Sequence, residues 1–136
     1  MDLFDLRRTP FHLHTKLDNL AIGFEGGKVT VGGKPGRWLL EPVPEPDTFR
    51  IHSFEDPSLA WNALEGMSPV QVALLPPITP RESHFRFAPV AGEEDTYEIL
   101  HGPDKGVSVY LPDETGQQPL TLLGAPSAYR ILVTLA

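Results

Sequence analysis

The sequence predicts an all-β protein of twelve short strands, arranged as three copies of one four-strand unit. Fifteen prolines and twelve glycines are spread along the 136 residues, where they separate short apolar runs. That spacing is typical of strands joined by tight turns. Apolar residues alternate within the runs, as they do in strands with one buried face. No stretch has the periodicity of a helix of normal length.

The first copy covers about residues 10–43, after an amphipathic terminal strap, residues 1–9, that is too short to form a stable helix alone. Its first strand alternates Phe11, Leu13 and Thr15 with His12 and His14, which indicates a half-buried strand. Three further strands follow, separated by glycine-rich turns, and are marked by Leu20, Ile22 and Phe24, by Val29 and Val31, and by Trp38 and Leu40.

The same pattern recurs over about residues 47–90 and 95–136, which indicates an internal repeat. Individual residues align between the copies: Asp47-Thr48-Phe49-x-Ile51 with Asp95-Thr96-Tyr97-x-Ile99, and Trp38-x-Leu40-x-Pro42-Val43 with Phe85-x-Phe87-x-Pro89-Val90. We therefore expect one domain over residues 1–136, in which the strands close on themselves to hide their edges. This arrangement resembles the β-trefoil, in which six strands form a short barrel and three hairpins cap one end.

Composition excludes several classes of protein. Eighteen acidic residues against eleven basic ones give a net charge of -7, which opposes the phosphate neutralisation that nucleic-acid binding requires. There is no cysteine, so disulfides and thiolate metal sites are excluded. The sequence shows neither a signal peptide nor an apolar run long enough for a membrane span. We expect no membrane association and a cytoplasmic location, or secretion without a recognisable signal peptide.

The repeat is irregular between its third and fourth strands. Val29 to Trp38 and Leu120 to Tyr129 are each nine positions apart, whereas Val70 to Phe85 is fifteen, so the middle copy carries six extra residues. They fall in the stretch 76–83, which prolines stiffen and which presents Arg81. A rigid loop of this kind loses little entropy on docking. The predicted protease-binding loop consists of Pro77, Ile78, Thr79, Pro80, Arg81 and Glu82. The alternative is a stiff surface excursion in which Arg81 pairs with a neighbouring acid. A smaller expansion covers residues 113–118.

Catalytic and metal sites are not indicated. His12 and His14 share a strand face and His52 repeats the position of His14, but no third ligand has a recognisable spacing. No serine lies in a G-x-S-x-G turn, and the paired carboxylates lie in turn-like sequence. We expect a protein that is not an enzyme and holds no cofactor or metal. Trp38 and Trp61 are predicted to pack in the core. Asn62 is predicted to point to the other side of its strand.

An aspartate follows the leading aromatic residue of each copy by seven positions, at Asp18, Asp56 and Asp104. Repeated acids suit a sugar-binding site in each copy. The alternative is ordinary turn chemistry, since Asp56 precedes a proline and Asp104 follows one.

The third copy resembles the cysteine-poor β-trefoil protease inhibitors of fungi, whose fold is similar to the ricin B chain. The likeness lies mostly at core positions, in Tyr97-x-Ile99, Val109-Tyr110-Leu111-Pro112-Asp113, Leu120-x-Leu122 and Tyr129-x-Ile131. Tyr110 and Tyr129 stand where these inhibitors often have tryptophan. The Q-x-W motif of ricin-type lectins is absent, because Gln71 and Gln118 are each followed by other residues.

This resemblance implies a protein that inhibits proteases through a surface loop. A trypsin-like pocket holding a carboxylate would take a cation, for which Arg81 fits best and Lys105, Lys16 and Lys34 are poorer candidates. A serine protease is the favoured target, although a cysteine protease of the legumain type would take Asn19. The second hypothesis is a carbohydrate-binding, lectin-like module that uses Asp18, Asp56 and Asp104. A third is a repeat-derived or engineered scaffold without a ligand.

Overall fold

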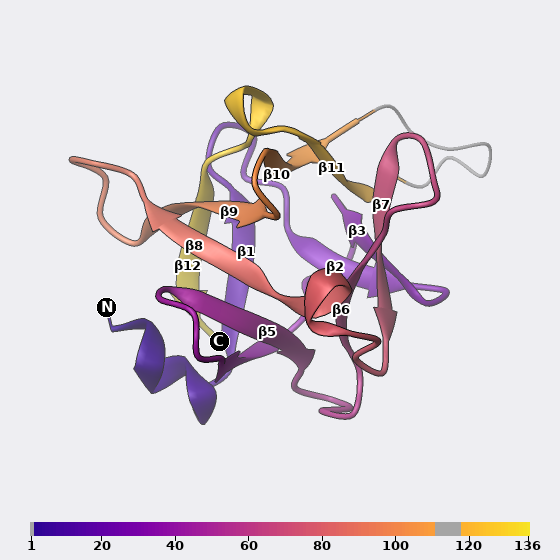
Figure 1. The fold of residues 1–136 in the computed structure, drawn as a ribbon. Coiled ribbons are helices and arrows are strands. Elements are labelled where there is room, and N and C mark those ends of the chain that lie inside the picture. The colour runs from indigo at the N-terminus through magenta and orange to yellow at the C-terminus, as the bar shows by residue number, and fades with distance from the viewer. Residues whose placement is uncertain (1, 111–117) are drawn as a thin grey trace.

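The computed structural model describes residues 2–110 and 118–136 (Figure 1). All twelve predicted strands form. They are β1 (Phe11–Thr15), β2 (Ile22–Glu25), β3 (Lys28–Val31), β4 (Trp38–Pro42), β5 (Thr48–Ser53), β6 (Ala60–Leu64), β7 (Val70–Leu75), β8 (Phe85–Pro89), β9 (Thr96–His101), β10 (Lys105–Val109), β11 (Leu120–Gly124) and β12 (Ile131–Leu135). The helices are short: η1 (Leu3–Arg7), α1 (Pro80–Ser83) and η2 (Ala125–Ser127).

Six of the strands close into a ring. β1 pairs with β4, β4 with β5, β5 with β8, β8 with β9, β9 with β12, and β12 returns to β1, all antiparallel. The remaining strands form the hairpins β2–β3, β6–β7 and β10–β11. These hairpins contact one another through the pairings β3–β7 and β7–β11 and a bridge between Thr30 and Pro119. The predicted barrel with three capping hairpins, the β-trefoil arrangement, is confirmed.

The core lies inside this barrel. The fourth strand of each copy begins with a fully buried residue: Trp38 in β4, Phe85 in β8 and Ile131 in β12. The Trp61 ring meets the Trp38 ring edge-on at 5.4 Å and the Phe85 ring at 5.8 Å. Trp61 is also fully buried. The predicted core positions of both tryptophans are therefore confirmed.

The terminal strap folds into η1, a 3-10 helix. The Asp2 carboxylate caps it by accepting a hydrogen bond from the Phe4 backbone N–H at 2.9 Å. Leu6 is fully buried, and the Phe4 ring lies edge-on to Phe49 at 6.0 Å. Because an isolated segment of this length would not hold a helix, its docking against β4 is what orders it.

The aspartate and threonine that open the second and third copies form the same turn. Asp47 and Asp95 both have φ of 54°, in the left-handed region that Asp tolerates better than most residues. Their carbonyl groups accept hydrogen bonds from the backbone of β8 and β12, respectively. The following Thr48 and Thr96 each donate a hydroxyl bond to the carbonyl two residues earlier. This turn therefore sets the backbone conformation from which β5 and β9, the first strands of the second and third copies, begin.

Some of the segments singled out in the sequence lie outside the described residues. Residues 113–117 of the smaller expansion, and Leu111 to Asp113 of the inhibitor-like segment, lie outside the described residues. Over the ranges 2–110 and 118–136, no helix is long and apolar enough to cross a membrane.

Candidate functional site

Consecutive copies meet at three junctions, where the fourth strand of one copy pairs with the first strand of the next. The first junction is β4–β5, the second β8–β9 and the third β12–β1. Equivalent cross-strand pairs lie near the same end of each junction: Leu39 with His52, Arg86 with Leu100, and Leu132 with His14. The second junction therefore differs from the others at both positions.

At the first junction, polar contacts fill the surface. The two His52 ring nitrogens lie 2.8 Å from the Pro57 carbonyl oxygen and 2.8 Å from Glu41 Oε1, and Arg50 Nη1 lies 3.4 Å from the same Glu41 oxygen. Burial raises the pKa of the Glu41 carboxyl, but the bond from His52 and the charges of His52 and Arg50 outweigh it, so the net pKa is lowered. The remaining cavity is only about 220 Å³.

The third junction is closed by an ion-pair cluster. Lys16 Nζ lies 3.0 Å from Glu93 Oε1, and Arg130 Nη1 lies 2.8 Å from Glu93 Oε2. Lys16 also donates to the Thr96 hydroxyl at 3.1 Å. The hydrogen bond from Lys16 lowers the pKa of Glu93, assisted by the charges of Arg130 and Lys16.

This cluster predicts a small acid-dependent contribution to stability. A carboxyl whose pKa is lowered by folding stabilises the folded state above its ordinary pKa, and that contribution is lost as the pH falls through the folded pKa. Glu93→Gln is therefore expected to lower the melting temperature slightly at pH 7, and the difference from the parent is expected to be lost as the pH falls from there through the lowered pKa of Glu93. Thermal melts of both proteins across this range test it. A difference that persists unchanged at low pH would contradict it.

At the second junction the surface is open, and the opening forms a groove of about 1020 Å³, the junction groove. Leu100 stands where the other copies have His14 and His52. Gly102 stands where they have Lys16 and Phe54, and its φ of 61° suits glycine. The histidine of the other two junctions and the Lys16 of the third are therefore missing from this one, whereas Glu45 and His84, 3.5 Å apart, stand where Glu93 and Arg130 stand at the third.

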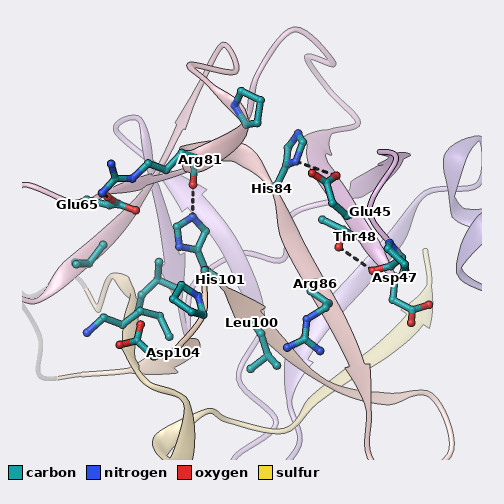
Figure 2. A pocket seen from close by; sticks show the side chains of 17 residues that line it. Glu45, Asp47, Thr48, Glu65, Arg81, His84, Arg86, Leu100, His101 and Asp104 are labelled. Carbon is teal, nitrogen blue, oxygen red and sulfur yellow. Dashed lines mark hydrogen bonds and ion pairs between the residues drawn. The ribbon is translucent and has the colours of Figure 1, made fainter.

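Polar side chains rise around an apolar floor in the junction groove (Figure 2). Val70, Leu100 and Leu122 supply the apolar part. Glu45, Asp47 and Thr48 lie on one side, and Glu65, Arg81, His101 and Asp104 lie on the other, with Arg86 and Leu100 between them. The groove thus offers carboxylate acceptors and guanidinium donors over apolar surface.

One wall of the groove is α1, which forms within the long connection from β7 to β8, the insertion. The predicted length of six extra residues aligns Tyr129 with Trp38, whereas the strand register aligns Ile131 with Trp38 and Phe85. Thr79 precedes it, and the Thr79 carbonyl oxygen accepts from the backbone N–H and the hydroxyl of Ser83 at 3.0 and 2.9 Å. The Thr79 hydroxyl also hydrogen-bonds to Glu82. Pro80, Arg81 and Glu82 of the predicted protease-binding loop are consequently helical and not extended.

Asn62 holds the insertion in place. It points away from the Trp61 side of β6, as predicted, but it is fully buried beneath the insertion. Its Nδ2 donates to the Ala60 and Leu75 carbonyl oxygens at 3.0 and 3.1 Å, and its Oδ1 accepts from the Ile78 backbone N–H at 3.0 Å. One feature of the sequence signals this role, a lone amide inside an apolar strand.

Arg81 is the exposed tip of α1, with 78% of its side chain accessible. Its Nη2 lies 2.7 Å from Glu65 Oε2, so it pairs with a neighbouring acid. Its carbonyl oxygen accepts a 2.7 Å hydrogen bond from His101 Nε2. At the equivalent position of the other copies, Thr15 and Ser53 accept from the backbone of their own turns. His101 instead ties the third copy to the insertion of the second.

The three repeated aspartates have different surroundings. Asp18 lies exposed in the turn after β1. Asp56 accepts bonds from the Ser58 backbone N–H at 3.2 Å and from its hydroxyl at 2.6 Å, which is turn chemistry. Asp104 lines the junction groove together with Arg81, whereas Asp18 and Asp56 do not line it. The groove is thus lined by Pro80 and Arg81 of the predicted protease-binding loop and by Asp104 of the predicted sugar-binding set.

The remaining candidate residues are dispersed. Lys105 lines the junction groove, Lys34 is exposed elsewhere, and Asn19 lies in the turn after β1 with φ of 54°. His12 Nδ1 lies 2.9 Å from the Gly36 carbonyl oxygen. Burial, and then the charge of His12, lower the pKa of His14. Within the described part of the chain, no three histidine or acidic side chains group as metal ligands would.

Comparisons with known proteins bear on the fold. No protein-family model and no curated protein matches the sequence. Among solved structures, the chain is similar to a mosquitocidal holotoxin, with a TM-score of 0.74 and 12% identity, over 95% of this chain and 17% of the toxin. It is also similar to the BEL β-trefoil in an apo crystal form (TM-score 0.63, 11% identity, 94% of each chain). A third is SeviL bound to asialo-GM1 saccharide (TM-score 0.61, 14% identity, 94% of this chain and 98% of that one).

The chain covers a small part of the toxin but nearly all of the other two proteins. Identities this low establish the fold alone. The structural similarities and the strand pairing together show that the chain adopts a β-trefoil fold.

Proposed function

We propose that the protein is a carbohydrate-binding module that holds one saccharide in the junction groove between its second and third copies. The observation that carries this proposal is the contrast between the junctions. His52 with Glu41, and Lys16 with Glu93, fill the first and third, whereas the second is open.

The chemistry of the junction groove supports a sugar as the ligand. Sugars present both hydroxyl groups and apolar C–H faces. Asp47 and Asp104 supply acceptors, Arg86 supplies donors, and Leu100 and neighbouring aliphatic side chains supply an apolar floor. The similarity to SeviL, whose structure holds a saccharide, agrees with this proposal. A single groove replaces the threefold set of Asp18, Asp56 and Asp104 as the proposed site. Binding, without catalysis, is the proposed role.

Protease inhibition through Arg81 has weaker support. An extended peptide pairs its backbone with the edge of a partner's sheet, but Arg81 lies in a helical turn and its carbonyl oxygen already accepts from His101. Its guanidinium is paired with Glu65. A protease would have to displace both contacts.

The test of the proposal closes the groove by copying the first junction. Leu100→His with Ala88→Gln introduces side chains at the positions of His52 and Glu41. A glycan array, followed by calorimetry on the strongest glycan, is expected to show binding by the parent and at least a tenfold weaker affinity, about 1.4 kcal/mol, for the double variant. The matched control is His52→Leu with Glu41→Ala, which changes the equivalent positions outside the groove.

Two outcomes would overturn the proposal. The first is a parent protein that binds no glycan on the array. The second is a closed variant that remains folded and binds as tightly as the parent. Protease inhibition that Arg81→Glu abolishes would favour the loop hypothesis instead.

A further inference from the structure

The cation Arg86 distinguishes the junction groove from its two counterparts. Its equivalents at the other junctions are Leu39 and Leu132, each facing a histidine across the strands. At the second junction the leucine, Leu100, lies on the first strand of the next copy, and it faces Arg86. A charge therefore appears where the other copies have leucine, and it does so in the open groove.

Arg86 also lacks an acidic partner. Arg81 is paired with Glu65 at 2.7 Å, and Glu45 lies 3.5 Å from His84. Across residues 2–110 and 118–136, neither Arg86 nor Lys105, the other cation of the groove, forms an ion pair. Both cations therefore remain available to a ligand.

The two cations flank the floor of the groove. Arg86 on β8 pairs with Leu100 on β9, and Lys105 on β10 pairs with His101 on the opposite edge of β9. Two strand spacings of about 4.8 Å therefore separate their backbones. Figure 2 shows the Arg86 guanidinium beside Leu100, with Asp47 and Asp104 farther out on opposite sides.

Arg86 lies between the acids of the two sides, where its planar guanidinium can bond a carboxylate through two parallel N–H groups. The acids are peripheral, where they can accept bonds from hydroxyl groups. A neutral sugar would leave the central guanidinium without a charged partner. A long polyanion would be repelled by the carboxylates of Asp47 and Asp104 at the rim.

We propose that the ligand of the junction groove is a saccharide with an anionic substituent, a carboxylate or a sulfate ester, bound by Arg86 with Lys105 as a second cation. This inference rests on the proposed carbohydrate-binding function and specifies its ligand class. Arg86 sets the preference for the anionic group, while Leu100 and the peripheral acids contact the rest of the sugar.

The test compares saccharides that differ only in the charged group. An array would carry matched neutral, sialylated, uronic-acid-containing and sulfated forms of the same glycans, and the strongest pair would be titrated by calorimetry. The parent is expected to prefer an anionic form, which identifies carboxylate or sulfate as the source. Its affinity for that form is expected to fall with added NaCl, because salt screens exposed charges.

Three variants assign the preference to Arg86. Arg86→Gln is expected to weaken binding of the anionic form by roughly tenfold or more and to weaken the neutral form by much less, because Gln keeps an amide donor for hydroxyl groups. Arg86→Lys keeps the charge but loses the two parallel N–H groups. Its affinity for the anionic form is expected to lie between those of the parent and Arg86→Gln. Arg8→Gln removes the same charge from an exposed site outside the groove and is expected to bind like the parent.

The outcomes separate this inference from the function on which it rests. Preference for neutral forms, or unchanged anionic binding by Arg86→Gln, would overturn the inference and leave carbohydrate binding intact. An array without any signal would overturn both.

Discussion

Replacing Trp38 with alanine is expected to lower the free energy of unfolding by about 3–5 kcal/mol. Trp38 is fully buried, and its Nε1 donates to the Ile22 carbonyl oxygen at 3.2 Å. Its ring packs edge-on against Trp61 and Phe24, at 5.4 and 6.0 Å. The change would leave a cavity in a closed barrel, and such an interior relaxes only partly.

Urea unfolding followed by circular dichroism measures this loss. Trp38→Phe is the intermediate case, since it keeps an aromatic ring but removes the bond to Ile22. Leu17→Ala is the matched surface control, because Leu17 is 85% exposed, and its effect is expected to stay within about 0.5 kcal/mol. A Trp38→Ala protein less than about 1 kcal/mol below the parent would show that the barrel refills the space.

Asn62→Ala is expected to cost roughly 2–4 kcal/mol, because it removes the partner of several backbone groups at once. The Ala60 and Leu75 carbonyl oxygens and the Ile78 N–H would lose their bonds to the buried amide. The insertion that carries α1 would also lose its anchor. Under the proposed function, glycan affinity is therefore expected to fall along with stability, although Asn62 does not line the groove.

Asn62→Asp keeps an acceptor for the Ile78 N–H but places a buried carboxylate against the Ala60 and Leu75 carbonyl oxygens, so it is expected to cost at least as much as Asn62→Ala. Hydrogen exchange at Ile78 reports on the loop directly, and chemical unfolding reports on the whole barrel. If Asn62→Ala exchanges and unfolds like the parent, the insertion is held by other contacts.

The fold was predictable because its signals are local and repeated. Alternation of apolar residues marks each strand, and glycines and prolines mark the turns. The alignment of Thr48-Phe49 with Thr96-Tyr97 proved to be a shared turn, in which Asp47 and Asp95 adopt left-handed backbone. The burial of Trp38 and Trp61 followed from the same alternation.

The site was predictable only in part. The insertion was visible from its length, but α1 is a single turn, and no local pattern specifies so short a helix. Contacts from Asn62 and His101, distant in sequence, set its shape. Asp104 was found by its repeat position, whereas the same rule selected Asp18 and Asp56, which do not line the groove. The groove is open because Leu100 and Gly102 replace the larger or polar residues of the other copies. That effect becomes clear only when the second junction is compared with the first and third.

The inequality of the three junctions has a consequence for valency. A protein with three equivalent sites could cross-link a glycan-coated surface, since linked binding events reinforce one another through effective concentration. Under the proposed function, the described part of this chain presents one open groove and engages one saccharide at a time. Strong adhesion would then depend on several copies of the chain being brought together, so that assembly would control avidity while the groove controls selectivity.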